Sequence, residues 1–494
     1  MDEKDWFRLK KYPHIGLPLT LKDRAWVDKY VRDEKKIASH GFYPFIHRET
    51  LVRKYRRKTE KDGSKSAYRF SDRKPRELYY ANHLDANIFS YYAKLLGEKY
   101  EKKLIDLGIQ DCATAYRRIA INSKATKAIH KSNCDFAAEI FNYILENKSN
   151  KLTAITLDVK SFFDNIPHDK LKKSICYILD KVSLDKDYFN IFKNITRFSF
   201  VNENQLFNEF KDDIIIQNKV GIRRKKISKQ RYLRNQKAIA YCYLNEFEKR
   251  ILNKKLVIKN QYVDLVSKEI RNKGIPQGSP ISAVLANIYM LSFDKAIATY
   301  ITSVNGLYRR YSDDMVVICK EEYEKDIQKL FNDEIDKLGL EFQTKKTQIF
   351  QFDKIGSRFI CAQKLDGKLN NNKNFEYLGF EFDGFNTFLK SASLSGYYRK
   401  LKRSIHRGKF YAKVDSAKNG IFKSRLYKKF TYKGAERKRV YIQDKSDPSI
   451  WLPTTRYNWG NFISYAYLAA NKLPNNKIKR QTRRHWNVLN KLIA

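Results

Sequence analysis

The chain has 494 residues and a formal net charge of +45, from 99 Lys and Arg against 54 Asp and Glu. Because 42% of its residues are hydrophobic, it can build real cores, which excludes wholesale disorder and suggests two or three subdomains. So large a positive excess indicates a polyanionic partner, and phosphate backbones are the commonest one.

The N-terminal segment MDEKDWFRLKKY lacks the apolar core of a signal peptide. No stretch approaches the roughly 20 apolar residues of a membrane span. No two of the six cysteines stand at C-x-x-C spacing, which argues against a zinc ribbon and suits buried thiols in a reducing compartment. We therefore expect a cytoplasmic protein with no membrane partner.

The first 150 residues predict a basic, mixed region followed by helices. Residues 51–66 (LVRKYRRKTEKDGSKS) are predicted to form a charged loop. A helix is expected after residue 80, because Ile88, Tyr91 and Leu95 fall at helical spacing. Residues 137–148 predict a second helix.

The middle of the chain predicts a strand, a helix and a strand hairpin. Residues 152–159 (LTAITLDV) are typical of a half-buried or central strand. Residues 279–298 predict a helix with Ser279 as its N-cap. Residues 307–319 (LYRRYSDDMVVIC) predict two short strands around a tight turn. Beyond these, a helix is expected over 321–338, a strand over 340–350, a polar loop over 365–374, a hairpin over 375–385 and basic helices from about residue 390.

Three carboxylates stand out from this pattern. Asp158 ends an apolar strand, where an unpaired charge is costly, and Asp313 and Asp314 share a turn, where they repel each other. Each has a plain structural explanation on its own, a capped strand end or a solvated hairpin tip. Together they suit a divalent metal, since Mg²⁺ takes hard oxygen ligands and relieves the repulsion. Two such ions about 3.5–4 Å apart clamp the attacking and leaving oxygens of a phosphoryl displacement.

The surrounding residues resemble the motifs of the reverse transcriptase family, in the family's order, over roughly residues 75–390. LDVKSFFDNIPH is similar to motif A, GIPQGSPISAVLANIYM to motif B, and Tyr311-Ser312-Asp313-Asp314 to motif C. The resemblance implies an RNA-directed DNA polymerase, a nucleotidyltransferase that adds deoxynucleotides with two Mg²⁺ ions, Mn²⁺ being the alternative. It names Asp158, Val159, Asp313 and Asp314 as metal ligands.

The same resemblance assigns roles around the incoming nucleotide and the template. Phe163, five residues after Asp158, would be the steric gate that excludes a ribose 2′-hydroxyl. In motif B, Gly274 and Gly278 allow close backbone approach. The predicted nucleotide-binding residues are Arg117, Phe163, Gln277 and Gly278, and the predicted template and primer residues of motif B are Gly274, Pro276 and Ser279.

Weaker similarities extend the set. GLEFQTKKT resembles motif D, so Lys346 would approach the pyrophosphate leaving group, with Lys345 as its rival. FEYLGFEF resembles the primer grip, with Tyr377, Leu378 and Gly379 as its core. Farther on, three basic residues of the C-terminal region are predicted to hold the template-primer duplex by its phosphates: Arg399, Lys402 and Arg403.

The expected architecture is an α+β right hand. Fingers with a basic N-terminal extension would cover residues 1–150, and a palm with an antiparallel sheet would cover 151–385. The long interval from Asp158 to Gly274 indicates an insertion in the palm, near 195–262. A basic helical thumb would cover 386–494.

Within the family, the PQGSP and Tyr-Ser-Asp-Asp variants and the long insertion are most like the bacterial abortive-infection and defence-associated reverse transcriptases. That resemblance implies anti-phage defence with a structured noncoding RNA as template or scaffold, in addition to dNTPs and a DNA product, and a homo-oligomer in several cases. The alternatives are a group II intron-like or retron-like enzyme, an RNA-directed RNA polymerase, and a catalytically silent RNA-binding scaffold.

Overall fold

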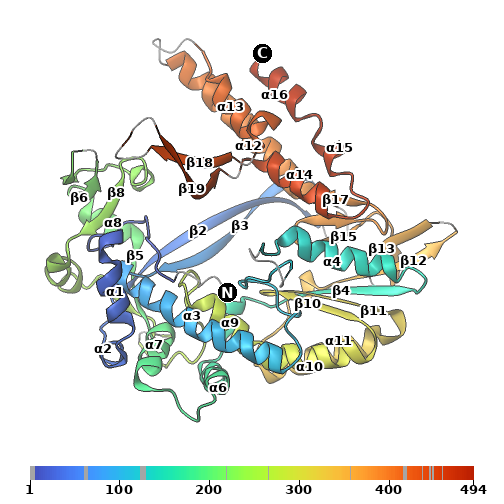
Figure 1. Cartoon of the computed structure of the whole chain (residues 1–494), viewed down its shortest axis with the longest axis horizontal. Helices are drawn as coiled ribbons and strands as arrows, with labels where there is room; N and C mark the ends of the chain where they lie inside the picture. Colours follow the sequence, from blue (N-terminus) through green and yellow to red (C-terminus); the bar gives the residue numbers. More distant parts are fainter. Residues whose placement is uncertain are drawn as a thin grey trace.

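The computed structural model describes residues 6–59, 65–122, 129–218, 220–264, 266–356, 358–365, 367–414, 420–436, 438–443, 447, 450–458 and 460–494. Helices and antiparallel sheets are mixed along the chain, which confirms the predicted α+β class (Figure 1). The predicted domain boundaries at residues 150 and 385 remain predictions.

A six-stranded antiparallel sheet forms the centre, in the order β10-β11-β4-β12-β13-β14. Its strands are β10 (Leu307–Tyr311), β11 (Asp314–Lys320), β4 (Leu152–Asp158), β12 (Gln348–Ile355), β13 (Arg358–Leu365) and β14 (Lys368–Asn370). The apolar segment predicted as a central strand is indeed β4, paired on both sides. The strand expected over 340–350 starts later, because Thr344–Lys346 form a single 3₁₀ turn before β12.

Helices cover one face of this sheet, below it in Figure 1. Ile155, Leu157 and Met315 point from β4 and β11 into the largest hydrophobic core, which these helices share. The helices are α3 (His83–Asp106), α6 (His168–Leu179), α9 (Ser282–Tyr289), α10 (Leu291–Ser303) and α11 (Glu324–Lys337), with α1 (Arg24–Val31), α2 (Glu34–Ala38), α5 (Phe162–Asn165) and α7 (Lys186–Thr196) at the margin.

The opposite face of the sheet packs on α4 (Asn133–Glu146) and on a small sheet. That small sheet contains β15 (Phe375–Tyr377), β16 (Phe380–Phe382) and β17 (Thr387–Leu389), so the predicted hairpin over 375–385 is present. Two C-terminal helices, α14 (Phe462–Lys472) and α15 (Ile478–Thr482), join the same core. Residues 462–482, close to the C-terminus, therefore pack beside the central sheet.

A long hairpin replaces the predicted charged loop. β2 (Phe45–Thr59) and β3 (Lys65–Tyr80) pair antiparallel from Ile46↔Tyr80 outward, so the prediction of a loop over 51–66 is wrong for the described residues. The error arose because the charges of this segment suggested a solvated loop, whereas strand pairing satisfies the backbone hydrogen bonds of a charged segment as well. The base of the hairpin pairs with β5 (Ser199–Asn202), which pairs with β9 (Val257–Lys259).

The segment near 195–262 forms a unit with its own core. Its sheet runs β1-β8-β6-β7, with β1 (His14–Ile15), β8 (Ala238–Cys242), β6 (Ile214–Gln217) and β7 (Ile222–Lys225). α8 (Glu203–Phe210) closes the core. Since β1 pairs in parallel with β8, the N-terminal segment is part of this unit.

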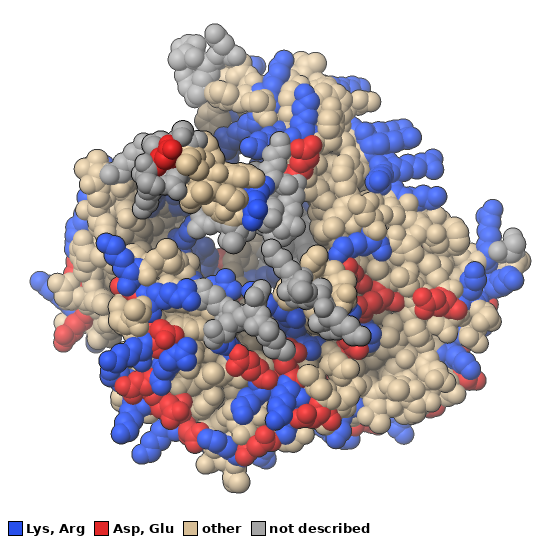
Figure 2. Space-filling model, in the orientation of Figure 1, with Lys and Arg blue, Asp and Glu red and all other residues tan. Residues whose placement is uncertain are grey.

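The C-terminal region is helical, as predicted, and also contains an unexpected hairpin. Its elements are α12 (Ser391–Val414), α13 (Lys423–Phe430), α16 (His485–Ile493), β18 (Lys438–Gln443) and β19 (Trp451–Asn458). Lys and Arg gather over these helices at the top of Figure 2, whereas acidic and basic residues alternate over the lower face. Within the described segments, no helix is both long and apolar enough to cross a membrane.

Candidate active site

The strand register brings two of the three predicted carboxylates face to face. Asp158 ends β4 and Asp314 begins β11, and the two residues are direct partners in the antiparallel ladder. Asp313 lies in the turn between β10 and β11, where Ser312 has a φ of 63°. The backbone N–H of Val159 donates to the carbonyl of Asp313 over 3.3 Å, so the strand end and the turn are held together.

The electrostatics of this cluster are unfavourable for a carboxylate. Burial of the Asp314 carboxyl is the largest cause that raises its pKa to about 6, followed by the charges of Asp313 and Asp158. A hydrogen bond between the carboxyl groups of Asp314 and Asp158 acts in the same direction. The cluster therefore lacks positive charge at its centre.

One cation partly offsets the negative charge of this cluster. Lys346 reaches from the 3₁₀ turn before β12, and its Nζ lies 2.6 Å from Oδ1 and 2.7 Å from Oδ2 of Asp158. The motif D lysine thus binds the motif A carboxylate directly. The side chain of Lys345, its rival, lies outside the described part of the structure.

Among the described residues, no three His, Cys, Asp or Glu side chains are already arranged around one point as a finished metal site. The donor set nevertheless fits Mg²⁺, because it consists of hard carboxylate oxygens under mutual repulsion and already attracts the ammonium of Lys346. Asp158, Asp313 and Asp314 are the residues that would hold the ions.

Beneath the turn lies a buried polar network that the sequence did not reveal. Arg310 and Asp294 are both fully buried and form an ion pair of 2.6 Å. Asp294 also accepts a 2.8 Å hydrogen bond from the hydroxyl of Tyr308. Arg310 in turn donates to the carbonyl of Ser312 and to the side chain of Asn287, each over 3.1 Å. The guanidinium therefore supports the backbone of the Asp-Asp turn from below.

The network also reaches motif B and the segment before residue 117. Asn287 of α9 donates to the carbonyl of Ala115, and the N–H of Thr114 donates to the carbonyl of Arg310. The available signal was Asp294, a lone carboxylate three residues after Leu291, the last position of a hydrophobic helix face. Its partner Arg310 could be identified only once the strands were placed.

Motif B is fixed by two glycines at backbone contacts. At Gly274, with φ +95°, a Cβ would lie 2.9 Å from the carbonyl oxygen of Asp164 in α5. At Gly278, with φ +113°, a Cβ would lie 2.7 Å from the carbonyl oxygen of Tyr79 in β3. The close backbone approach predicted for these glycines is present, and it joins motif B to motif A and to the long hairpin.

The helix of motif B starts later than predicted. α9 begins at Ser282, so Ser279 is not its N-cap and Pro280 is not its first residue. The reason is a turn over 279–282, in which the N–H of Ser282 donates to the carbonyl of Ser279 over 3.3 Å. The hydroxyl of Ser282 also donates to the carbonyl of Pro276. The hydroxyl of Ser279 is buried and has no hydrogen-bond partner among the described residues. The side chain of Gln277 is half-buried.

Phe163 lies beside this turn, in α5. Its ring is half-buried and packs on the main core, and its carbonyl accepts the N–H of Ile275 over 2.8 Å. The backbone of the predicted gate is thus hydrogen-bonded to motif B, which fixes the position from which the ring projects.

The predicted primer grip is a strained turn between β15 and β16. Leu378 has a φ of 44°, a left-handed conformation that is uncommon for a branched side chain, and Gly379 follows with a φ of 93°. Before them, Tyr377 is buried, and its hydroxyl has no partner in the described part of the chain. Burial raises the pKa of Tyr377, and the Asp314 charge adds to this effect.

The side chain of Arg117, predicted to bind the triphosphate, contacts other parts of the protein. Its side chain is 6% exposed and pairs with Glu101 of α3 over 2.6 Å. It also donates to the backbone carbonyls of Gln110 and Ala113. These are the contacts of a structural arginine, so binding a triphosphate would first require the pair with Glu101 to open.

The basic residues Arg399, Lys402 and Arg403 lie on the exposed side of α12, whereas Tyr397 and Leu401 are buried in a hydrophobic core of the C-terminal region. The structure therefore leaves these three cations available for a phosphate backbone. Their role in binding template and primer remains a prediction.

Residues 236–382 match the family model described as reverse transcriptase (RNA-dependent DNA polymerase). The match includes motifs B, C and D, and Asp158 precedes it. No curated protein matches the chain.

Solved structures of telomerase are among those similar to this chain. An apo telomerase from Candida tropicalis, truncated from its C-terminal domain, is 13% identical with a TM-score of 0.36, over 73% of this chain and 59% of that one. A Candida albicans telomerase in complex with a TWJ fragment of telomeric RNA is 12% identical with a TM-score of 0.34, over 77% and 52%. This chain therefore spans little more than half the length of those proteins.

Proposed function

We propose that the chain is an RNA-directed DNA polymerase, supported by the match of residues 236–382 to the reverse transcriptase family model, and that it joins deoxynucleotides by two-metal-ion catalysis at Asp158, Asp313 and Asp314. The observation that carries this proposal is the register that opposes Asp158 and Asp314 across adjacent strands, with Asp313 in the adjoining turn. Copying of a primed RNA into DNA by the purified chain, and its loss in an Asp313→Ala/Asp314→Ala variant, tests the assignment.

The chemistry divides between the ions and the chain. Bound Mg²⁺ would stabilise the negative charge on the attacking and leaving oxygens. The three carboxylates would hold the ions, and Arg310 supports the backbone of the turn through the Ser312 carbonyl. Lys346 can leave Asp158 as positive charge arrives there, and it then donates a hydrogen bond or a proton to the leaving pyrophosphate.

Replacing Lys346 with alanine is expected to have two opposite effects. The rate of nucleotide addition should fall by about 10²-fold, the usual contribution of a positioned acid. The Mg²⁺ concentration needed for half-maximal rate should decrease, because Lys346 no longer competes for Asp158. Single-turnover incorporation across a Mg²⁺ series measures both quantities.

Lys345→Ala is the matched control for this pair of effects. It removes the same charge one residue away, and it should leave the Mg²⁺ requirement unchanged. A larger rate loss in Lys345→Ala than in Lys346→Ala would transfer the motif D role to Lys345.

Selection of deoxynucleotides is assigned to Phe163. Phe163 lies within the segment similar to motif A. Its carbonyl accepts the N–H of Ile275, and its half-buried ring packs against the main core. Phe163→Ala should therefore increase ribonucleotide use relative to deoxynucleotide use by about 10²-fold, since a site that excludes a group by steric contact loses that exclusion when the contact is removed. The measurement is the ratio of kcat/KM for dCTP and CTP on one primed template. A ratio unchanged in Phe163→Ala, with activity retained, would show that another residue is the gate.

We further propose that the polymerase acts in the bacterial cytoplasm in anti-phage defence, with a structured noncoding RNA as template or scaffold and as a homo-oligomer. The support is the PQGSP and Tyr-Ser-Asp-Asp variants, the insertion between motifs A and B, and the charge of +45. Recovery of the chain from its native cells with no bound RNA would contradict the RNA partner.

A further inference from the structure

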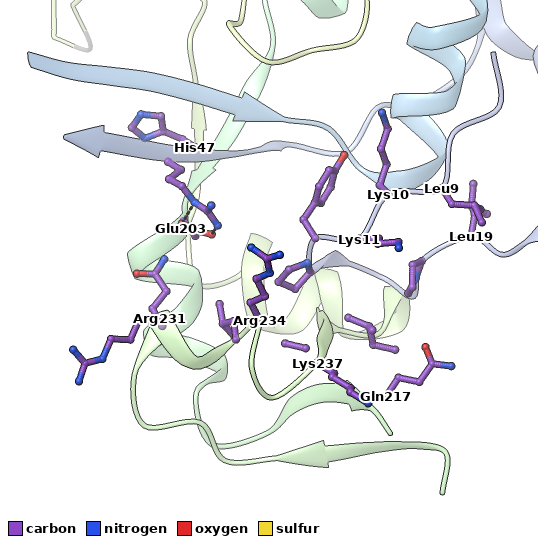
Figure 3. Close-up of a pocket in the computed structure, with 18 of the residues that line it drawn as sticks. Leu9, Lys10, Lys11, Leu19, His47, Glu203, Gln217, Arg231, Arg234 and Lys237 are labelled. Carbon is purple, nitrogen blue, oxygen red and sulfur yellow. Dashed lines mark hydrogen bonds and ion pairs between the residues drawn. The ribbon is translucent and has the colours of Figure 1, made fainter. Parts of the chain in front are cut away.

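A large cavity lies in the insertion, away from the carboxylates. It measures about 1500 Å³ and is lined by the N-terminal segment, the base of β2 and the start of β8. Figure 3 shows side chains from these three parts of the chain around it, with Lys10 and Lys11 on one side and Arg231 and Arg234 on the other. We call this cavity the insertion pocket.

The lining of the insertion pocket is strongly cationic. Seven Lys and Arg residues face it, against two Glu residues. One of these acids is already neutralised, because Glu203 is buried and pairs with Arg48 over 2.6 Å while accepting a hydrogen bond from Tyr80. Among the described residues, Lys11, Arg234 and Lys237 form no ion pair at all.

Two arginines of the same unit, by contrast, are each paired with two acids. Arg250 pairs with Glu209 and Asp213, and Arg224 pairs with Asp213 and Glu246. None of these three carboxylates lines the pocket. Unpaired cations that share one cavity repel each other, and this cost is relieved when a polyanion binds.

The remaining lining residues suit a ligand that carries bases as well as phosphates. Leu9, Pro13 and Leu19 give the cavity apolar surface, against which an unstacked base can pack. Four amide side chains, those of Asn202, Asn204, Gln217 and Gln230, supply donors and acceptors for base edges or sugars. A free phosphate would fill only a small part of about 1500 Å³.

The backbone at Lys237 is fixed in an unusual conformation. Its φ is 55°, in the left-handed region that a lysine seldom adopts. Its carbonyl accepts the N–H of Gln217, and its N–H donates to the carbonyl of Arg234, so three pocket residues are tied together. Strain of this kind is common where a chain positions a side chain for binding.

We propose that the insertion pocket binds an unpaired polynucleotide strand, with phosphates on Lys11, Arg234 and Lys237 and bases on the apolar wall. A duplex is disfavoured because recognition of its shape requires an open surface, whereas a cavity accepts bases one by one. None of Asp158, Asp313 and Asp314 lines the pocket. We therefore expect the pocket to hold a strand segment other than the one at the carboxylates.

The test uses the full chain and a defined probe. A single-stranded RNA of about ten nucleotides that contains 4-thiouridine is cross-linked to the protein, and the sites are located by mass spectrometry. The expected cross-links fall in residues 9–22 and 230–239. In Lys11→Ala/Arg234→Ala they should be lost, affinity should drop about tenfold, and the slope of log K against log salt should decrease by about 1.4, since each single-strand phosphate contact contributes about 0.7.

Lys325→Ala/Lys329→Ala on α11 is the matched control, because it removes two exposed, unpaired cations of the described chain far from the pocket. It should keep the cross-links and the affinity. A single-stranded DNA probe of the same sequence distinguishes an RNA strand from a DNA product as occupant, and either one supports the proposal. Equal cross-linking of a duplex, displacement by inorganic phosphate at similar concentration, or unchanged cross-links in Lys11→Ala/Arg234→Ala would overturn it.

Failure of this proposal is separable from failure of the polymerase assignment. The Asp313→Ala/Asp314→Ala variant should retain the pocket cross-links although it makes no DNA. Lys11→Ala/Arg234→Ala should extend a short, preformed primer-template at the wild-type rate.

Discussion

Replacing Asp314 with asparagine is expected to reduce DNA synthesis by about 10³-fold or more, because metal clamping of a phosphoryl transfer contributes several kcal/mol and each 1.36 kcal/mol is about tenfold in rate. In EDTA the same variant should be more stable than the wild type. Asp314 directly opposes Asp158 in the sheet, and like charges so placed destabilise by about 0.2–1 kcal/mol. For a chain of this size the melting temperature should rise by about 1 °C.

The stability gain has a pH dependence that follows from the pKa of Asp314. Burial, followed by the charges of Asp313 and Asp158, raises that pKa to about 6 from 3.8. Because the folded state binds this proton more tightly, the wild type keeps the full stabilisation below the unfolded pKa and loses it as pH rises through about 6. The melting-temperature difference between Asp314→Asn and the wild type should therefore grow from about pH 5 to about pH 7 in EDTA. A constant difference, or a less stable variant, would show that the two carboxylates do not repel each other.

Replacing Asp294 with asparagine is expected to destabilise the protein by about 3–5 kcal/mol, the largest stability loss of any single change discussed. The substitution leaves the fully buried Arg310 without a counter-charge. It also weakens the support of the Ser312 carbonyl, so polymerisation should fall in the fraction that remains folded. Urea denaturation followed by tryptophan fluorescence measures the change.

The control for this prediction is Asp333→Asn on α11, an exposed carboxylate whose loss should cost less than about 0.5 kcal/mol. A second substitution sharpens the test. Adding Arg310→Met to Asp294→Asn removes the unpaired charge and should recover part of the stability, which a double-mutant cycle reports as coupling. Additive losses in the two variants would mean that the ion pair is not the source of the effect.

The sequence predicted the parts of the site that depend on local pattern. The short apolar runs within 152–158 and 314–319 and the alternation within 307–311 place β4, β11 and β10 correctly, because both patterns are typical of strands. Asp313 and Asp314 were therefore expected in the turn. The opposition of Asp158 and Asp314 depends on register, which only the pairing of distant strands defines.

The parts that could not be predicted depend on partners far apart in the chain. Arg117 was assigned to the triphosphate from its neighbours in sequence, whereas its pair Glu101 becomes visible only when the following loop folds back on α3. The long hairpin was assigned as a loop because its charge suggested exposure to solvent, although strand pairing satisfies the backbone of a charged segment as well. Likewise, β1 joins the insertion through a parallel pair with β8, a contact across more than 200 residues.

The most direct measurement of the central claim is incorporation of labelled deoxynucleotides by the wild type and by Asp313→Ala/Asp314→Ala, each purified with the RNA that accompanies it and supplied with Mg²⁺. The expected result is DNA from the wild type alone, with a sequence complementary to the accompanying RNA. Equal polymer from both proteins, or polymer made only from ribonucleotides, would contradict an RNA-directed DNA polymerase whose metal ligands are these aspartates.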